Sequence, residues 1–583
     1  MRLRLALIGA GVLLVLVAAP LLGWPPVVRL PAVLLPALVA ALLVVRPSPA
    51  GGSVLADADW QPSSRAVRAA AVLVGLLLFW YVLTRFRSAE INAVDFTVYY
   101  DRPCFQTAHG RPLFVEVSDT PALSHRSELA DHAYWGMLFV CLPYVLHPTP
   151  LWLHALSAIA IAAGAVYVLR ILQRLGVGGV LASASAIAFL LNDNTARTLN
   201  YGFHPEVLYA WFVPWLIEAG LRGARRSFLA ATLACLLVKE DACFPLFAAA
   251  VALALNRYRA MSPGDRALFL VVPPAIGLAN LGAYYRWVVP MLTGQARPAY
   301  AHFWGNYGDT PASAMVGMLR HPWTVLAAAT GSGIFKTLQP HLFLPLVGWR
   351  WAVGLFPLVA LYGASANEQV RAFGIYYAIV LVPFLVIATA MGALSLIRRF
   401  FVHGRNAQLA AAAIVLLGAL LVGSGSRGYS LRPWRKEVAA VPDALARLRD
   451  EPVVLVQSGL FPHAGYDERV ELLTPETLQD PGHAGAVVLL AHHLGAYPFH
   501  HHSLAPLFGL PPVAGLPPGL MAVRIDRPPP PPTVTDLVPH RRRHGHRAGE
   551  RMGGGLPDGT WGASLSCDHR SHGGECRPRA RGR

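Results

Sequence analysis

The stretch "FLAATLACLLVKEDACFPLFAAAVALAL", residues 228–255, places three consecutive charged side chains inside a long apolar run. Lys239, Glu240 and Asp241 are flanked on both sides by residues that suit the interior of a lipid bilayer. A charged group near the bilayer centre costs at least about 2.5–3.5 kcal/mol, and such groups persist where they face protein, water or a functional cavity. We therefore expect two short helices that meet at these charges, with the three side chains lining a cavity rather than contacting lipid.

The composition of the whole chain is typical of a multi-pass membrane protein. Of the 583 residues, 55% are hydrophobic and only 14% are charged, and the mean hydropathy is +0.45. Soluble domains carry roughly 25% charged residues. The net charge of +17 comes from arginines that cluster at the ends of apolar runs and in the final tail, a distribution that argues against nucleic-acid binding. The six cysteines include no CxxC pair, so we expect neither a disulfide framework nor a zinc ribbon.

The apolar runs predict an all-α core of about 11–13 transmembrane helices. Several runs are shorter than the ~17 residues that a perpendicular crossing needs, so some helices should be tilted or re-entrant. The first run follows a basic start and resembles a signal peptide, but a second run follows at once, which favours a retained first helix. The expected spans lie near residues 5–23, 27–45, 67–85, 150–171, 178–192, 206–221, 228–239, 242–256, 266–289, 336–349, 351–364, 372–396 and 407–424.

Arginine clusters alternate between successive loops along nearly the whole chain. Examples are the cluster of Arg222, Arg225 and Arg226 and the later pair Arg398 and Arg399. Loops rich in Lys and Arg stay on the cytoplasmic side of a membrane. This pattern predicts a cytoplasmic N-terminus, and an odd number of crossings then leaves the C-terminal part outside.

Five regions follow from these patterns. Near the end of the chain, "VPDALARLRD" looks helical, and "PVVLVQSG", "GAVVLLAHH" and "GLMAVRID" look like strands. This combination predicts a small α/β domain. The tail is basic and rich in Gly, Pro and His, so it should be disordered, and no metal site is expected there. The regions are N-terminal transmembrane helices (1–85), a first large extracytoplasmic loop with an interfacial helix (86–149), the transmembrane core (150–429), an extracytoplasmic α/β domain (430–526) and a disordered basic tail (527–583).

The first large loop opens with two carboxylates in "NAVDFTVYYDR", residues 92–102. A carboxylate held at the mouth of a membrane cavity can act as a general base toward a hydroxyl group or bind a metal ion. Asp95 and Asp101 are therefore candidate catalytic residues. The alternative is that each is an ordinary solvated loop acid.

Two further stretches carry candidate substrate-binding residues. "LNYGFHPEVLYAWFVPW", residues 199–215, places His204 and Glu206 at the end of an expected span, where they can grip a phosphate-bearing head group. Lys239 can bind a phosphate as a point charge, with Glu240 or Asp241 pairing with it or assisting catalysis. The alternatives are a polar helix-entry turn in the first case and a neutralised ion pair that fixes helix packing in the second.

Six stretches together resemble a family of bacterial predicted membrane proteins of unknown function allied to the GT-C glycosyltransferase superfamily. The resemblance covers roughly residues 85–520. The stretches are "VDFTVYYD", "TAHGRPLF", "ADHAYW", "FHPEVLYAWFVPW", "LLVKEDACF" and "GIYYAIVLVPFLV".

This resemblance implies a membrane enzyme that moves a sugar from a polyprenyl-phosphate-linked donor to a cell-envelope glycan, lipid or protein. Such enzymes work on the outer side of the bacterial cytoplasmic (inner) membrane, and an acid in the first large loop serves as base or electrostatic stabiliser, a position held here by Asp95. The family usually carries a second acid five residues later, where this chain has Tyr100. The resemblance does not specify a cofactor, and a divalent cation (Mg or Mn) is compatible with such a site. Other polar positions that match the family are Asp131, His132, His204, Glu206, Glu240 and Asp241.

Two other classes of function compete with a glycosyltransferase. A transporter or flippase of lipid-linked sugars would use Lys239, Glu240 and Asp241 as coupling or substrate-binding charges, although the sequence shows no clear inverted repeat. A non-catalytic membrane scaffold would use the outer α/β domain. The absence of a Walker or GxGxxG phosphate loop argues against a soluble nucleotide-sugar donor.

Overall fold

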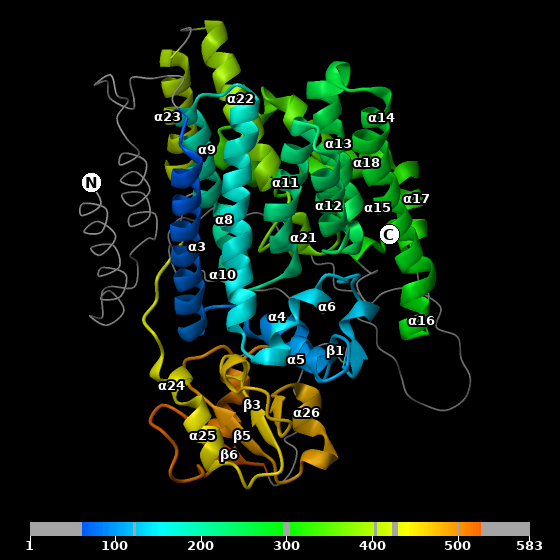
Figure 1. Cartoon of the computed structure of the whole chain (residues 1–583). Coiled ribbons are helices and arrows are strands. Elements are labelled where there is room, and N and C mark those ends of the chain that lie inside the picture. Colours follow the sequence, from blue (N-terminus) through cyan, green and yellow to red (C-terminus); the bar gives the residue numbers. More distant parts are fainter. Residues whose placement is uncertain are drawn as a thin grey trace, which may run out of the picture. The chain divides into compact units, whose positions relative to one another are not determined.

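The computed structural model is built mainly from helices, with a small sheet in the C-terminal region (Figure 1). All described residues belong to a single compact unit. The two expected spans before residue 60 and the expected tail lie outside the described residues. The structure describes residues 61–119, 124–294, 303–400, 405–421, 429–499 and 501–525.

Four helical segments of the described residues are long and apolar enough to cross a bilayer, judged by length and composition. Other predicted spans form shorter helices, among them α9 (Gly179–Leu191) and α23 (Arg405–Leu421). The total number of crossings therefore stays a prediction. The four long segments are α3 (Ser64–Arg87), α8 (Leu151–Arg174), the run Pro263–Thr293 and Val382–Arg399 within α22 (Val382–Phe400).

Helix α8 packs against α3, α9 and α11 (Tyr209–Arg222), and one face of it is buried through Leu153, Ile161 and Val168. The close approach to α11 requires glycine at position 164, because a methyl group there would overlap the carbonyl oxygen of Ala210. These contacts hold α11, and with it the segment that carries His204 and Glu206, against the core.

The charged triplet forms the turn of a helical hairpin, as the sequence predicts. Helix α12 (Arg225–Leu236) ends just before it and α13 (Cys243–Arg257) begins just after it, with a single 3-10 turn, η6 (Glu240–Ala242), between them. Lys239 and Glu240 are buried, with 7% and 3% of their surfaces exposed. The arginine-bearing ends of both helices lie at the opposite end of the hairpin.

The predicted span at 336–349 does not form a continuous helix. Helix α19 (Ile334–Leu338) is followed by two 3-10 turns, η11 (Gln339–His341) and η12 (Leu344–Leu346). Proline within each turn removes a helical hydrogen-bond donor, and Leu342 and Phe343 between the turns adopt positive φ angles. The predicted span at 372–396 becomes helical only at the start of α22.

The rest of the described helical core consists of short helical segments, of which those between Pro263 and Thr293 follow one another without a break and make up the long run named above. These segments are α10 (Asp193–Tyr201), η5 (Pro205–Leu208), η7 (Tyr258–Ala260), α14 (Pro263–Arg266), η8 (Ala267–Val271), α15 (Val272–Ala283), η9 (Tyr284–Val288), α16 (Val289–Thr293), α17 (Pro311–Arg320), α18 (Pro322–Thr330), η13 (Trp349–Trp351), η14 (Val353–Leu355), α20 (Phe356–Gly363) and α21 (Glu368–Arg371).

The first large loop is ordered by short helices and a two-stranded antiparallel ribbon. The segment in which an interfacial helix is expected contains two short helices, α6 and α7, and buries Met137, Cys141 and Tyr144 on one face. Phe139 and Leu146 are exposed on the other face, at 64% and 87%. The elements are α4 (Ala93–Phe96), η2 (Thr97–Asp101), α5 (Arg102–Ala108), β1 (Phe114–Val115), β2 (Arg126–Ser127), η4 (Glu128–Ala130), α6 (Met137–Val140) and α7 (Pro143–Leu146).

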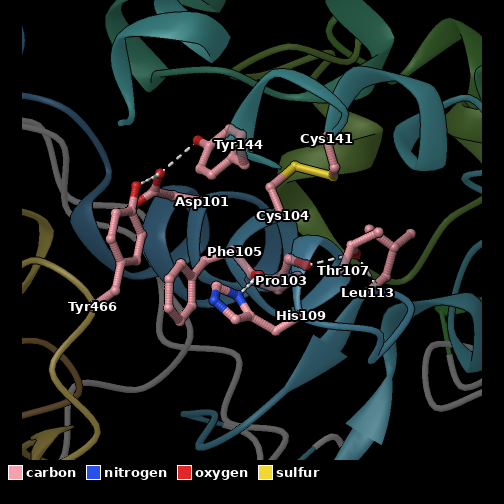
Figure 2. Close-up of a disulfide and its surroundings, with 10 residues drawn as sticks. All are labelled: Asp101, Pro103, Cys104, Phe105, Thr107, His109, Leu113, Cys141, Tyr144 and Tyr466. Atoms are coloured by element: carbon pink, nitrogen blue, oxygen red, sulfur yellow. Dashed lines mark hydrogen bonds between the residues drawn. A yellow bond between two sulfur atoms is a disulfide. The ribbon is translucent and has the colours of Figure 1, made fainter. Parts of the chain in front are cut away.

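A disulfide between Cys104 and Cys141 ties α5 to the end of α6 (Figure 2). The expectation that the cysteines form no disulfide framework is therefore wrong for this pair. The two residues are 37 positions apart in sequence, and only the folding of the loop brings their Cα atoms to 4.7 Å. Cys235 and Cys243, on the helical hairpin, are buried free thiols.

The C-terminal region forms a four-stranded sheet with the strand order β4-β3-β5-β6. Strand β3 pairs in parallel with β4 and β5, and β6 runs antiparallel to β5. Strands β3, β5 and β6 match the three predicted strands, whereas β4 was not predicted. The elements are α24 (Lys436–Ala439), α25 (Val441–Arg447), β3 (Val454–Val456), η15 (Phe461–His463), β4 (Val470–Leu472), α26 (Pro475–Gln479), η16 (Pro481–His483), β5 (Val487–Leu490), η17 (His501–Leu504), α27 (Ala505–Phe508) and β6 (Met521–Arg524).

Removing the disulfide should destabilise the protein measurably. Cross-linking a loop of this length restricts the unfolded chain, and such bridges typically stabilise by about 2–4 kcal/mol. We expect Cys104→Ser to lower the thermal unfolding midpoint in detergent. Cys104→Ser combined with Cys141→Ser should be no less stable than the single variant, because the bridge is already lost. An unchanged midpoint in Cys104→Ser would contradict the disulfide.

Candidate active site

Asp95 lies at one edge of the buried polar network, in the short helix α4. Asn92 caps this helix through its side chain. The backbone N–H of Asn92 donates a hydrogen bond to the backbone carbonyl of Tyr201 at 2.9 Å. The Tyr201 hydroxyl in turn donates a hydrogen bond to Asp95 Oδ2. Asp95 is half-buried, so its carboxylate is both oriented by a neighbour and partly accessible.

His204 and Glu206 form the centre of the network. Glu206 Oε1 accepts a hydrogen bond from Lys239 Nζ at 2.7 Å, and Glu206 Oε2 faces His204 Nδ1. The His204 ring stacks on Tyr376, with ring centroids 3.4 Å apart. Tyr201, which holds Asp95, also contacts the rings of His204 and Tyr376. A continuous set of contacts therefore links Asp95 to Lys239.

The stretch "ADHAYWG" docks on the turn that carries the charged triplet. His132 Nδ1 lies 3.0 Å from Glu240 Oε1, and the Ala133 amide donates to Glu240 Oε2 at 3.0 Å. The Gly136 amide donates to the carbonyl of Leu237 at 2.7 Å. Asp131 lies on the other side of His132, with Oδ2 3.8 Å from Nε2. This contact places the first large loop directly against the hairpin.

Asp241 is held by two tyrosines. The hydroxyls of Tyr209 and Tyr362 donate to its two carboxylate oxygens, each at 3.1 Å. Asp241 also lines a small cavity together with Glu206 and Tyr377. The carboxylates of Glu206 and Asp241 therefore line the same cavity.

Tyr100 and Tyr134 fill the space between the loop and the hairpin. The Tyr100 ring lies 4.9 Å from His204 and 6.1 Å from Tyr134, measured between centroids. Lys239 Nζ lies 6.0 Å from the centre of the Tyr134 ring. Tyr100 therefore contributes an aromatic wall to the site.

Glu128 is a buried carboxyl that the sequence did not single out. It is 5% exposed, and its Oε2 atom has no hydrogen-bond partner among the described residues. Burial raises the pKa of Glu128 well above its usual value, and the charge of nearby Asp131 raises this pKa further. The only sequence signal was its place in "SELADH", three residues before Asp131.

Asp101 directly follows Tyr100 in sequence but contacts different partners, Tyr144 and Tyr466 (Figure 2). Its Oδ1 atom accepts hydrogen bonds from Tyr144 at 2.6 Å and from Tyr466 at 2.8 Å. Successive residues of a helix point in directions about 100° apart. Asp101 therefore joins the interfacial helix to the C-terminal domain, while Asp95 and Tyr100 face the network.

The donor atoms of this site do not match a metal centre. In the described residues no group of three or more His, Cys, Asp or Glu side chains could hold a metal ion. The divalent cation considered from the resemblance has no set of ligands here, and no chemical step is assigned to it.

The network combines an oriented carboxylate, a buried ammonium group and two imidazoles within the protein interior. An oriented, half-buried carboxylate such as Asp95 can accept a proton from a hydroxyl group. A buried ammonium group such as Lys239 can stabilise negative charge that develops on a leaving group. The arrangement is suited to transfer of a group between a hydroxyl and a phosphate.

Comparison with known proteins yields one family and several solved structures. A family profile described as "Predicted membrane protein (DUF2079)" matches residues 88–477. The crystal structure of ArnT from Cupriavidus metallidurans bound to undecaprenyl phosphate aligns with a TM-score of 0.42 and 10% identity, covering 79% of this chain and 98% of ArnT. The cryo-EM structure of arabinofuranosyltransferase AftD from Mycobacteria aligns with a TM-score of 0.41 and 16% identity, covering 81% of this chain and 40% of AftD. No curated protein matches the sequence.

Asp101 should make stability depend on pH. Burial raises its pKa from 3.8 to about 6, against the lowering effect of its tyrosine partners. Because the folded state holds the proton more tightly, this contribution is complete below about pH 4 and is lost as the pH rises through 6. We expect wild type to lose about 3 kcal/mol relative to Asp101→Asn between these limits. Thermal unfolding of both proteins in detergent at pH 4.5, 5.5 and 7 measures this difference, and a constant difference would refute it.

Breaking the Glu206–Lys239 pair should be costly. Lys239→Met leaves the Glu206 charge buried without its ammonium partner, and such changes typically cost about 3–5 kcal/mol. Adding Glu206→Gln to Lys239→Met should recover part of this loss, because the uncompensated charge disappears. Arg225→Gln is the matched control: the Arg225 side chain is 62% exposed in its pair with Asp265, so about 1 kcal/mol or less is expected. Equal unfolding midpoints for Lys239→Met and Arg225→Gln would contradict a buried pair.

Proposed function

The chain belongs to the DUF2079 family of predicted membrane proteins, and from this premise we propose that it is a membrane glycosyltransferase of the GT-C type. It would transfer a sugar from a polyprenyl-phosphate-linked donor to a hydroxyl group of an extracytoplasmic acceptor in the bacterial cell envelope. The single observation that carries the proposal is the linkage of Asp95, through Tyr201 and His204, to the buried Glu206–Lys239 pair.

Two features support an extracytoplasmic site. Arginines gather at the end of the helical hairpin opposite the charged triplet, and such clusters stay in the cytoplasm. Arg225 and Arg226 begin α12 and Arg257 ends α13. The Cys104–Cys141 disulfide lies in the loop that contacts the triplet, and disulfides persist mainly in oxidising compartments outside the cytoplasm.

In the proposed reaction, Asp95 accepts the proton of the acceptor hydroxyl. The acceptor oxygen forms a bond to the anomeric carbon of the sugar while the bond from that carbon to the phosphate oxygen breaks. The polyprenyl phosphate leaves with the bonding electron pair, and Lys239 stabilises its charge. Lys239 binds Glu206 in the structure, so the phosphate would compete with that carboxylate for the ammonium group.

Transport of a lipid-linked sugar without chemistry is the second candidate. It is favoured by the surplus of buried carboxyl groups over basic groups around the triplet, since intramembrane acids often serve as coupling sites. A transporter should keep moving substrate in Asp95→Asn and lose transport when Lys239, Glu240 or Asp241 is neutralised. The enzyme and the transporter therefore differ in their response to a single substitution at Asp95.

Asp95→Asn should reduce glycosyl transfer by about 10²–10⁴-fold, the usual contribution of a general base. The assay follows product formed by the purified chain in liposomes with polyprenyl-phosphate sugars as donors. Asp309→Asn is the matched control, because Asp309 is exposed and lies just before α17, outside the network. Undiminished product with Asp95→Asn would refute the assigned base, provided that the variant reaches the membrane as wild type does.

A further inference from the structure

A polar cleft lies between the first large loop and the C-terminal sheet, separate from the network around Lys239. Its volume is about 280 Å³, close to the ~300 Å³ lower end of small-molecule binding sites. One wall comes from the loop and the other from strand β4 and the turn that precedes it. The polar residues that line the cleft are Arg102, Arg111, Glu116, His125, Glu468 and Glu471.

Hydrogen bonds beside the cleft join the first large loop to the C-terminal region. Arg102 is 6% exposed, and its guanidinium donates to the carbonyls of Gly465 at 3.2 Å and Asp467 at 3.4 Å. The same guanidinium bonds to Glu116 at 2.8 Å on the loop side. The bond from Tyr466 to Asp101 adds a second tie. The cleft is therefore formed before any ligand binds.

The charges of the cleft nearly balance. Arg102 and Glu116 neutralise each other as a pair, which leaves Arg111 opposite Glu468 and Glu471. Glu471 Oε2 lies 3.6 Å from His483 Nε2, which satisfies part of its charge. A phosphate group would meet Glu468 and Glu471, and a strongly cationic ligand would meet Arg111. Neither class of ion matches this wall.

The same wall offers hydrogen-bond donors and acceptors beside apolar surface. Carboxylates accept hydrogen bonds and guanidinium groups donate them, while the rings of Phe114 and Phe461 and the side chain of Leu472 supply apolar surface. A sugar has hydroxyl groups that both donate and accept, and its ring carries C–H groups that contact apolar surface. A neutral chain of sugars therefore fits the chemistry of both walls.

We propose that this cleft binds a neutral oligosaccharide, and that this chain carries the acceptor hydroxyl of the transfer reaction. The second half of this proposal rests on the proposed function. Val98 lines the cleft and follows Asp95 by three residues along the same helical segment, a rise of about 4.5 Å along a helix axis. The cleft therefore reaches to within about one helical turn of the carboxylate that accepts the proton.

The test measures binding of oligosaccharides by the full-length chain in lipid nanodiscs. The probes are neutral gluco-, manno-, galacto- and arabino-oligosaccharides, with acidic and amino-bearing oligosaccharides as comparisons. We expect wild type to bind a neutral probe, and Glu468→Gln combined with Glu471→Gln to weaken binding about tenfold or more. Asp450→Asn should bind as wild type does, because Asp450 is 90% exposed and lies outside the cleft.

Asp95→Asn separates the cleft from the chemistry. It should bind the neutral probe as wild type does while transfer is lost. If wild type binds neutral probes through the cleft but transfers no sugar, the proposed function fails and the cleft stands. If no neutral probe binds, if the double variant binds as tightly as wild type, or if only charged probes bind, the cleft proposal is overturned.

Discussion

The buried ion pair between Glu206 and Lys239 constrains the position of every other part of the site. Removing an ammonium group and a carboxylate from water costs several kcal/mol for each ion, and their attraction offsets this only when the geometry is good and further hydrogen bonds are made. Lys239 is placed by the turn between α12 and α13, and Glu206 by the turn before α11. The hairpin and α11 must therefore stay in one register for the pair to form.

The first large loop is anchored at both ends of this arrangement. His132 and Ala133 bind Glu240 on the hairpin, while Asp101 and Arg102 bind the C-terminal domain. Tyrosine hydroxyls provide hydrogen bonds to the carboxylates of the site. A tyrosine hydroxyl donates a hydrogen bond to a carboxylate without adding charge, as the bonds to Asp95 and Asp241 show. The loop, hairpin and domain are thus linked by polar contacts rather than by apolar packing alone.

Several features of the site were visible in the sequence. The charged triplet could only persist in an apolar run if it faced protein or a cavity: Lys239 and Glu240 are buried, and the half-buried Asp241 lines a small cavity. His204 and Glu206 were expected at the end of a span, and they lie beside Lys239. The strands of the C-terminal domain followed from short apolar runs between turn residues, except β4, whose "VEL" carries the charged Glu471 at the middle of its three positions.

The sequence by itself determined that the chain is a helical membrane protein with a polar centre, because hydropathy and the cost of buried charge act locally and leave a pattern in the residues. Tertiary structure alone decided which charges pair, that Asp101 serves the domain contact and not the network, and that Cys104 meets Cys141. Partners 30 to more than 300 positions apart leave no periodic signal, since their contact depends on how the helices pack. Adjacent residues such as Tyr100 and Asp101 look equivalent in sequence, yet the helix turns them toward different partners.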